Sequence, residues 1–583
     1  MAKKKPPRAT KLDKVQAYAD TYANIAGHHP SAALVDAFGQ AGDQSLITAS
    51  SHSERDAALS IGAAVAASSR KTHVATHPMR LNSPSIQALR EFVKAAGFTV
   101  STITPAATTE ERRAAYLADV VIGTLSDFAT DHLFDCCALD IADQRQSTWP
   151  ASASLVVDNL DEQLVDRSSE RVGEGGGTPP MTLRAFAKMH ATISGVAPSG
   201  RVNSSYLGSC YGIETIDVSE TSTVHRTDAP IVPYVSENST VTGAVKDIRR
   251  AISVGRPVLV ESTDATLLER VMQELKKARV VVVRATETDA PTQPKPGVVT
   301  VGSGLELMSA AGDMLSFDAD AVRERDIVRS LGGVHLVGLG LRDTQRADER
   351  FTDVIDAAAH GSTVQHVFVN GSKSVKALSD ALTARVAYEK EQEITRMRDL
   401  TYQSISDSQR EIITWDRQRL LLSGSLLNLV ETGAQEAADW VASEADPNHP
   451  EGVLQVVNSF VQTDLVASDV SGALSDGTLG GLVGEKFATW AREAWAATPI
   501  GDADRVARGV ALAVVDRKWA EHYRFLVELR QGIGYRRYAK LTPNIEFAKE
   551  ADEAFNRLHV SIAVETFGFA AHRLAGAEVL TGS

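Results

Sequence analysis

The chain has 583 residues and a formal net charge of −14, with 43% hydrophobic and 23% charged residues. This length exceeds what one hydrophobic core supports, so three or four globular domains are expected. The negative charge argues against general nucleic-acid binding, and the three cysteines, Cys136, Cys137 and Cys210, lack the spacing of a metal site.

A basic arm over residues 1–12 opens the chain, with the letters MAKKKPPRATK at its start. A disordered, solvated arm is the plain interpretation of these lysines. Attraction to anionic lipid headgroups is the alternative, because each lysine near a membrane surface contributes about 1 kcal/mol. The sequence has neither an apolar run as long as a membrane span nor the apolar core of a signal peptide, so we expect a cytoplasmic protein.

Residues 13–200 alternate short apolar runs with alanine-rich helical patterns, which predicts a parallel α/β sheet. The runs expected to form strands include LVDAF, SLITA, THVAT, FTVSTI and DVVIGT. A later run ends at Asp158 and is followed by Asp161. The structural interpretation of these acids is that both cap a helical turn.

A Gly-rich linker, RSSERVGEGGGTPP, follows over about residues 167–180. Its glycines do not predict a phosphate loop, because no Lys-Ser/Thr pair follows them and no strand precedes them. Residues 201–380 then repeat the strand and helix alternation and predict a second α/β domain.

The rest of the chain reads as helical. No Gly or Pro occurs from Ser372 to Ser423, which predicts a long helix over 381–424. About forty helical residues span roughly 60 Å, enough to connect domains. Residues 425–515 are helical and alanine-rich, and residues 516–583 predict a two-helix hairpin followed by a C-terminal helix.

The hairpin prediction rests on helical spacing of apolar residues on both sides of Pro543. The first face holds Trp519, Tyr523, Leu526, Leu529 and Ile533, and the second holds Ala548, Ala551, Phe555, Leu558 and Ile562. Between them lies a basic, aromatic tip made of Tyr535, Arg536, Arg537, Tyr538 and Lys540. On spacing alone, two bundle helices with a solvated basic turn explain this pattern.

Short sequence segments of this hairpin nevertheless resemble a known family. WAEH, LRQGIGYRRYA and P-x-x-E-F-x-K-E-A are similar to the two-helix finger of SecA, the motor of bacterial preprotein translocation. The segment ERRAAYLADVVIGT resembles part of the SecA nucleotide-binding domain, and YQSISDSQREII resembles part of its helical scaffold. The resemblance spans about residues 60–575. It implies two helicase-like parallel-sheet domains, a helical scaffold and wing-like region, and a finger, with Tyr538 at the position that meets the translocon.

The same alignment places other residues where SecA handles ATP. The family's phosphate-loop lysine corresponds to Glu54, and its catalytic glutamate corresponds to Asn159. Asp158 and Asp161 keep the acidic positions, so they are the candidate cofactor-binding residues. The family's arginines correspond to Thr352, Val354 and Ala357, while Arg346 and Asp348 hold the opening of that motif. The linker over 167–180 stands where SecA carries its preprotein cross-linking domain.

These departures predict a SecA-like pseudo-ATPase, an accessory or scaffold subunit of protein export without catalytic residues or a cofactor. ATP and Mg²⁺ are expected only if residual nucleotide binding survives. The expected partners are the SecYEG translocon or a catalytically intact SecA, with homo- or hetero-dimers, peripheral membrane contact through the basic arm, and no nucleic acid. Two alternatives stay open: an active accessory SecA-type translocase, and a structural adaptor outside transport.

Overall fold

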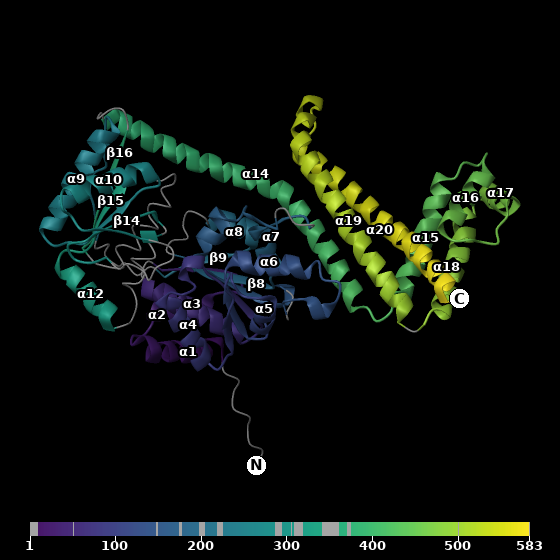
Figure 1. Ribbon diagram of the computed structural model, residues 1–583, viewed down its shortest axis with the longest axis horizontal. Coiled ribbons are helices and arrows are strands. Elements are labelled where there is room, and N and C mark those ends of the chain that lie inside the picture. The colour runs from purple at the N-terminus through teal and green to yellow at the C-terminus, as the bar shows by residue number, and fades with distance from the viewer. Residues whose placement is uncertain are drawn as a thin grey trace, which may run out of the picture. The chain divides into compact units, whose positions relative to one another are not determined.

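The computed structural model confirms the predicted fold class: two parallel-sheet domains of the helicase-like kind precede a helical region. Figure 1 follows the chain through these parts by colour. The residues that the structure describes are 10–49, 52–146, 150–173, 178–197, 204–218, 226–285, 294–304, 306–307, 319–340, 361–369, 375–499 and 501–581.

The first domain is built on a seven-stranded parallel sheet in the order β3-β4-β2-β5-β8-β1-β9. Its strands are β1 (Ser45–Thr48), β2 (Thr72–Ala75), β3 (Val100–Thr102), β4 (Val120–Gly123), β5 (Ser154–Asp158), β8 (Thr192–Ala197) and β9 (Glu214–Asp217). One face packs against α1 (Lys11–Ala26), α2 (Ala32–Gln40), α3 (His52–Ala67) and α4 (Pro84–Ala95). The other elements of this region are α5 (Thr109–Ala115), α6 (Leu125–Asp135), α7 (Leu183–Lys188), α8 (Ser204–Tyr211), η1 (Pro78–Arg80), η2 (Ile141–Asp143), η3 (Pro150–Ser152) and η4 (Glu162–Asp166).

Two expectations for this domain were wrong. The LVDAF run is part of helix α2, because the Ser31 side chain accepts the Leu34 N–H and so caps a helix there. A five-residue apolar run does not by itself distinguish a strand from a helix. The sheet also continues past the expected boundary at residue 200, since β9 pairs in parallel with β1 at its edge.

The second domain has a parallel sheet in the order β10-β16-β15-β12-β14-β13, with β11 also paired to β16. Its strands are β10 (Thr227–Asp228), β11 (Val232–Tyr234), β12 (Val258–Glu261), β13 (Val282–Arg284), β14 (Val299–Gly302), β15 (His335–Leu339) and β16 (Thr363–Val369). Helices α9 (Glu237–Ser253) and α10 (Ala265–Lys277) bury their apolar faces against these strands, and α12 (Ala319–Ser330) follows β14 along the chain.

The helical region begins with α14 (Val375–Leu422), an uninterrupted helix of 48 residues, as the lack of Gly and Pro predicted. The helices after it are α15 (Leu427–Glu444), α16 (Pro450–Phe460), α17 (Ala467–Asp476), α18 (Leu479–Ala497), α19 (Asp502–Gly532), the 3-10 turn η5 (Ile533–Ala539) and α20 (Pro543–Thr581). None of the helices in the described ranges is long and apolar enough to cross a membrane.

Helices α19 and α20 lie side by side and are joined by η5, which confirms the predicted hairpin (Figure 1). The expected apolar residues Trp519, Leu526, Ala551 and Phe555 are buried. Helix α19 begins at Asp502, ahead of the expected start of the hairpin at residue 516.

The chain divides into two compact units, and the division does not follow the sequence order. The first comprises the described residues of Met1–Ala129, Gln146–Glu170 and Thr182–Met397, and the second those of Thr130–Arg145, Arg171–Met181 and Arg398–Ser583. Part of the Gly-rich linker therefore belongs to the helical unit, where Arg410 on α14 donates to the Pro179 and Pro180 carbonyls at 3.1 and 2.8 Å. Beside it, β6 (Arg171–Val172) and β7 (Met181–Thr182) form a two-stranded sheet.

Candidate functional site

The acidic edge of the first sheet lies where β2 and β5 end. These neighbouring strands are parallel, with Ala75 opposite Val157, so Thr76 and Asp158 emerge together at their carboxyl ends. The Thr76 hydroxyl donates to Asp158 Oδ2 at 2.7 Å. Arg80, at the end of η1, donates from Nη1 to Asp158 Oδ1 at 2.8 Å. Both carboxylate oxygens of Asp158 therefore have a donor from the chain itself.

Arg80 also contacts a second carboxylate at this edge. Its Nη2 lies 3.1 Å from Asp56 Oδ1 on α3, and Asp56 Oδ2 accepts the Ser85 hydroxyl at 2.8 Å. The exposed fractions of the side chains are 18% for Arg80, 9% for Asp56 and 3% for Asp158. Burial opposes the guanidinium charge, but Asp158 and Asp56 outweigh it and raise the pKa of Arg80. The guanidinium thus bridges two largely buried acids.

Glu54, which the sequence resemblance placed at the family's phosphate-loop lysine, has a structural partner just before α2. Its Oε1 accepts the Ser31 N–H at 3.0 Å and its Oε2 accepts the Ser31 hydroxyl at 3.0 Å. Only three residues separate the end of β1 at Thr48 from the start of α3 at His52. A phosphate loop places the longer motif G-x-x-x-x-G-K-[S/T] between its strand and its helix. The connection here is therefore too short and also lacks the required residues.

Asn159 and Asp161 follow the strand that ends at Asp158. Asn159 is half-buried and has a φ of 51°, a backbone conformation in which asparagine is several-fold enriched. An amide does not accept a proton from water at neutral pH, so Asn159 cannot act as a general base. Asp161 is 3% exposed and immediately precedes the π-helix η4, but its side chain makes no capping hydrogen bond there.

For Asp158, the structural alternative of helix capping is therefore not what the structure shows. Asp158 is held by Thr76 and Arg80, and Asp161 does not cap η4 with its side chain. The Gln163 side chain reinforces the same edge, since its Nε2 donates to the Asp158 carbonyl at 2.7 Å and the Ala75 carbonyl at 3.3 Å.

These residues do not fit Mg²⁺ and ATP as a helicase-like site holds them. A magnesium ion needs free carboxylate or hydroxyl oxygens, whereas those of Asp158 accept from Arg80 and Thr76. The β and γ phosphates need a cation and backbone N–H groups, whereas the aligned position holds Glu54. The family's arginine positions, Arg346, Asp348, Thr352, Val354 and Ala357, lie outside the described residues.

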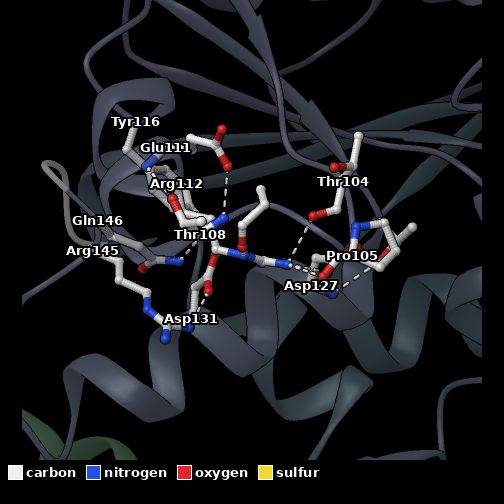
Figure 2. A network of polar contacts seen from close by, with 12 residues as sticks. Thr104, Pro105, Thr108, Glu111, Arg112, Tyr116, Asp127, Asp131, Arg145 and Gln146 are labelled. Atoms are coloured by element: carbon white, nitrogen blue, oxygen red, sulfur yellow. Dashed lines mark hydrogen bonds and ion pairs between the residues drawn. The ribbon is translucent and has the colours of Figure 1, made fainter.

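The ERRAAY motif forms a structural network rather than a reactive site (Figure 2). Glu111 completes a capping box with Thr108 at the start of α5. The Arg112 guanidinium donates to the Thr104 carbonyl at 3.0 Å and forms an ion pair with Asp127 at 3.0 Å. This motif therefore fixes the loop before α5 against the start of α6.

The tip of the α19–α20 hairpin gathers all five predicted contact residues in or beside η5. Tyr535 and Tyr538 are 72% and 88% exposed, and their rings stack with centroids 6.4 Å apart. Arg536 pairs with Glu550 of α20 at 2.9 Å. Lys540 ends η5 in a left-handed conformation with a φ of 59°. Leu541 and Ile545, next along the chain, are also exposed, so the tip combines cations with apolar surface.

Comparison with known families gives two matches. The SecA DEAD-like domain matches residues 57–172, and the SecA Wing and Scaffold domain matches residues 376–573. Together the two matches span more than half of the chain. The chain belongs to the SecA family.

Curated relatives agree with this membership. The protein translocase subunit SecA of Desulforapulum autotrophicum is 23% identical over 436 residues, which cover 67% of this chain and 50% of the relative. The SecA of Halothermothrix orenii is 23% identical, with 66% and 49% covered, and SecA 1 of Chlorobium chlorochromatii is 22% identical, with 71% and 43% covered. This SecA-family chain spans about half the length of the curated relatives it matches.

Two solved structures illustrate the similarity of this SecA-family chain to known folds. S. cerevisiae Dbp5 bound to RNA and ADP BeF3 is 11% identical with a TM-score of 0.41, covering 66% of this chain and 92% of Dbp5. The DUF1998 helicase MrfA bound to DNA is 11% identical with a TM-score of 0.39, covering 62% of this chain and 52% of MrfA.

Sequence reasoning missed the residues that give the acidic edge its character, Arg80, Asp56 and Thr76. Thr76 ends an expected strand and Arg80 follows it, but only the structure shows that this strand neighbours the one that ends at Asp158. Parallel neighbours bring their carboxyl ends to one edge, so a basic residue there has acids within reach.

Proposed function

We propose that this SecA-family chain is a component of protein export that does not hydrolyse ATP and that acts through its finger on protein partners. The partners we infer are the SecYEG translocon or a catalytically intact SecA. In this proposal the two sheet domains form a frame, and α14 and the helices after it carry the scaffold, the wing-like region and the finger.

The observation that carries the proposal is the bridge from Arg80 to Asp158 and Asp56. It puts a cation of the chain on the acid that magnesium would need. Glu54 and Asn159 remove two further contributions, phosphate neutralisation and proton transfer to a base. Each such loss lowers the rate of phosphoryl transfer by orders of magnitude, so the combination of losses supports a role without ATP hydrolysis.

The exposed tip supports the second half of the proposal. Tyr535 and Tyr538 expose most of their ring area, and large exposed aromatics are enriched at binding hot spots. Neither Arg537 nor Lys540 forms an ion pair with any described residue, so both charges are available to a partner. We further propose a cytoplasmic location with peripheral membrane contact through the basic arm.

The test of the ATPase half uses the purified full chain with Mg-ATP and the variant Asp158→Asn. We expect no turnover and no change in unfolding temperature at millimolar Mg-ATP for either protein. Turnover by the wild type that Asp158→Asn abolishes would instead establish an active accessory translocase.

The proposed role of the finger in partner binding is tested by measuring binding of the chain to SecYEG in proteoliposomes and to an intact SecA. We expect Tyr538→Ala to weaken binding at least about 10-fold, the loss typical of a hot-spot residue. The matched control is Tyr388→Ala, an exposed tyrosine on α14 that is not part of the tip. Equal binding by both variants, or no binding by the wild type, contradicts a role for the tip and favours a structural adaptor.

A further inference from the structure

The second sheet domain carries a basic groove between α9 and α10. The groove has a volume of about 680 Å³, and its lining includes Lys246, Arg249, Arg250 and Arg270. Both helices follow strands of the same parallel sheet, so they run in the same direction over it. Lys246, Arg249 and Arg250 recur at steps of three and four on α9, which puts them on adjoining parts of one helix surface.

The acids near this groove have other partners. Arg270 forms an ion pair with Glu237 at 2.5 Å and a hydrogen bond to Asn238. Glu274 pairs with Lys277 at 2.7 Å. Asp247 accepts from His335 on β15 at 2.7 Å, and this hydrogen bond lowers the pKa of its carboxyl.

Three cations of the groove therefore lack an ion-pair partner among the described residues, although the charge of Arg250 also helps to lower the pKa of the nearby Asp247 carboxyl. Lys246, Arg249 and Arg250 are exposed and make no ion pair with any residue in the described ranges. The chain as a whole carries a net charge of −14, so this local positive charge is opposite in sign to the net charge of the chain. Unpaired like charges on one helix surface are mutually destabilising, and a bound anion relieves that repulsion.

The size and donors of the groove define the anion. A volume of about 680 Å³ lies in the range of small-molecule sites, which run from about 300 to 1,000 Å³. Guanidinium groups bind phosphate oxygens through paired N–H donors, and an ammonium adds a point charge. The Asn238 and Gln273 amides add neutral donors to the lining, whereas the Thr242 hydroxyl donates to the Asn238 carbonyl at 2.8 Å.

We propose that the groove between α9 and α10 binds a small ligand that carries two or more phosphate groups. The ligand is either a free phosphate compound or the headgroup of a phospholipid, since both present the same oxygens to Lys246, Arg249 and Arg250. This site is separate from the acidic edge of the first domain and does not depend on the proposed loss of ATP hydrolysis.

The test is calorimetric titration of the full chain with inorganic pyrophosphate and with tripolyphosphate at two salt concentrations. We expect binding that weakens with salt, because the interaction is between charges open to solvent. The double variant Lys246→Gln/Arg249→Gln is expected to bind at least about 10-fold more weakly, since it loses two of the charged donors that would contact the phosphate oxygens. Unchanged unfolding temperature of this variant shows that it folds.

The matched control is Arg90→Gln/Lys94→Gln, two exposed cations four residues apart on α4. It makes the same change in net charge and is expected to bind pyrophosphate as the wild type does. The proposal is overturned if both double variants weaken binding equally. It is also overturned if the wild type does not bind millimolar pyrophosphate and the double variant in the groove does not change vesicle binding.

A second arm identifies the source of the phosphate. Vesicles that contain cardiolipin, whose headgroup carries two phosphate groups, are compared with vesicles of phosphatidylcholine, with and without competing pyrophosphate. Vesicle binding lost in Lys246→Gln/Arg249→Gln supports a lipid headgroup in the groove, and binding to pyrophosphate alone supports a free compound. Vesicle binding that the double variant retains, without pyrophosphate binding, overturns the proposal and assigns the membrane contact elsewhere.

Discussion

Arg80 shows how one side chain changes the chemistry of a whole sheet edge. Its guanidinium contacts Asp158 at 2.8 Å and Asp56 at 3.1 Å, and all three side chains are largely buried. Buried ion pairs add little net stability compared with apolar residues, but removing one partner leaves uncompensated charge and is costly. The residue therefore has a stability role that can be tested apart from any function.

Replacing Arg80 by alanine is expected to lower the free energy of unfolding by about 3–5 kcal/mol at neutral pH. The cause is that Asp56 and Asp158 lose the cation that they share. Denaturant unfolding of the full chain measures the loss. Arg90→Ala, on an exposed face of α4, serves as the control and is expected to change stability by less than about 0.5 kcal/mol. Equal effects of the two changes would show that the bridge contributes nothing.

His190 supplies a pH dependence in the same domain. Its Nδ1 faces the Phe186 and Ala187 carbonyls, which only accept, so Nδ1 carries the hydrogen. Its Nε2 then accepts from His73 Nδ1 at 3.1 Å. Burial lowers the pKa of His190 to about 4, against the opposing effect of those carbonyls. The folded state thus holds His190 neutral.

We therefore expect acid to destabilise the first domain through His190. A histidine in the unfolded chain titrates near pH 6.5. Between about pH 6.5 and 4, the unfolded state therefore binds a proton that the folded state does not bind. Stability is fully present above that window and falls by about 1.4 kcal/mol per pH unit within it. His190→Gln should remove this slope from the unfolding transition of the first domain measured from pH 7 to 5. His522 in the helical unit, whose pKa burial also lowers to about 4, keeps its own contribution. His572→Gln, at an exposed position, should leave both slopes in place.

At the scale of elements, the connection from β1 to α3 is too short for the phosphate loop that the sequence resemblance led us to look for there. Alignment of sequence words placed Glu54 at the lysine position, and the structure adds that Glu54 holds the start of α2 through Ser31. The position has thus acquired a local structural role. A carboxylate that accepts an N–H and a hydroxyl at a helix start stabilises it through both hydrogen bonds and the helix dipole.

Restoring the lysine by Glu54→Lys is expected to destabilise the chain by roughly 1–3 kcal/mol, because the Ser31 donors lose their acceptor. It should confer no affinity for Mg-ATP, since Arg80 still occupies Asp158 and the β1–α3 connection is still short. Thermal unfolding with and without Mg-ATP measures both effects. The control Glu91→Lys makes the same charge change on exposed α4 surface. Nucleotide-dependent stabilisation of Glu54→Lys alone contradicts the prediction.

Regular patterns in the sequence were sufficient to predict most elements. The 48-residue α14 and the α19–α20 hairpin follow from runs without Gly or Pro and from apolar steps of three and four. The LVDAF run was misread because its helix depends on the cap at Ser31, which Glu54 supports from 23 residues away. The Arg80 bridge could not be predicted, because it needs side-chain positions from three separate elements.

At the scale of the whole molecule, the chain has several separate hydrophobic cores. One lies under the first sheet, one under α9 and α10 of the second sheet, and one within the helical unit. A further small core, with Phe547 at 0% exposure, lies against the α14 residues Tyr402 and Ile405 near the finger tip. Proteins built from separate cores generally do not unfold in one step.

Calorimetric unfolding is accordingly expected to show more than one transition. Leu268→Ala, in the core of the second domain, should lower one of them at a cost of about 2–5 kcal/mol. Phe547→Ala, in the small core near the finger tip, should lower a different one at about 3–5 kcal/mol. A single transition that both substitutions shift alike would show that the cores unfold as one.

The bridge at the first sheet also determines what this domain requires from its surroundings. A bound metal dissociates and must be supplied, whereas the positive charge of Arg80 is a covalent part of the chain. The charge between Asp56 and Asp158 is therefore constant when the ionic supply of the cell changes. We expect chelation with EDTA to leave the unfolding temperature of the first domain unchanged, so this edge stays folded through magnesium starvation.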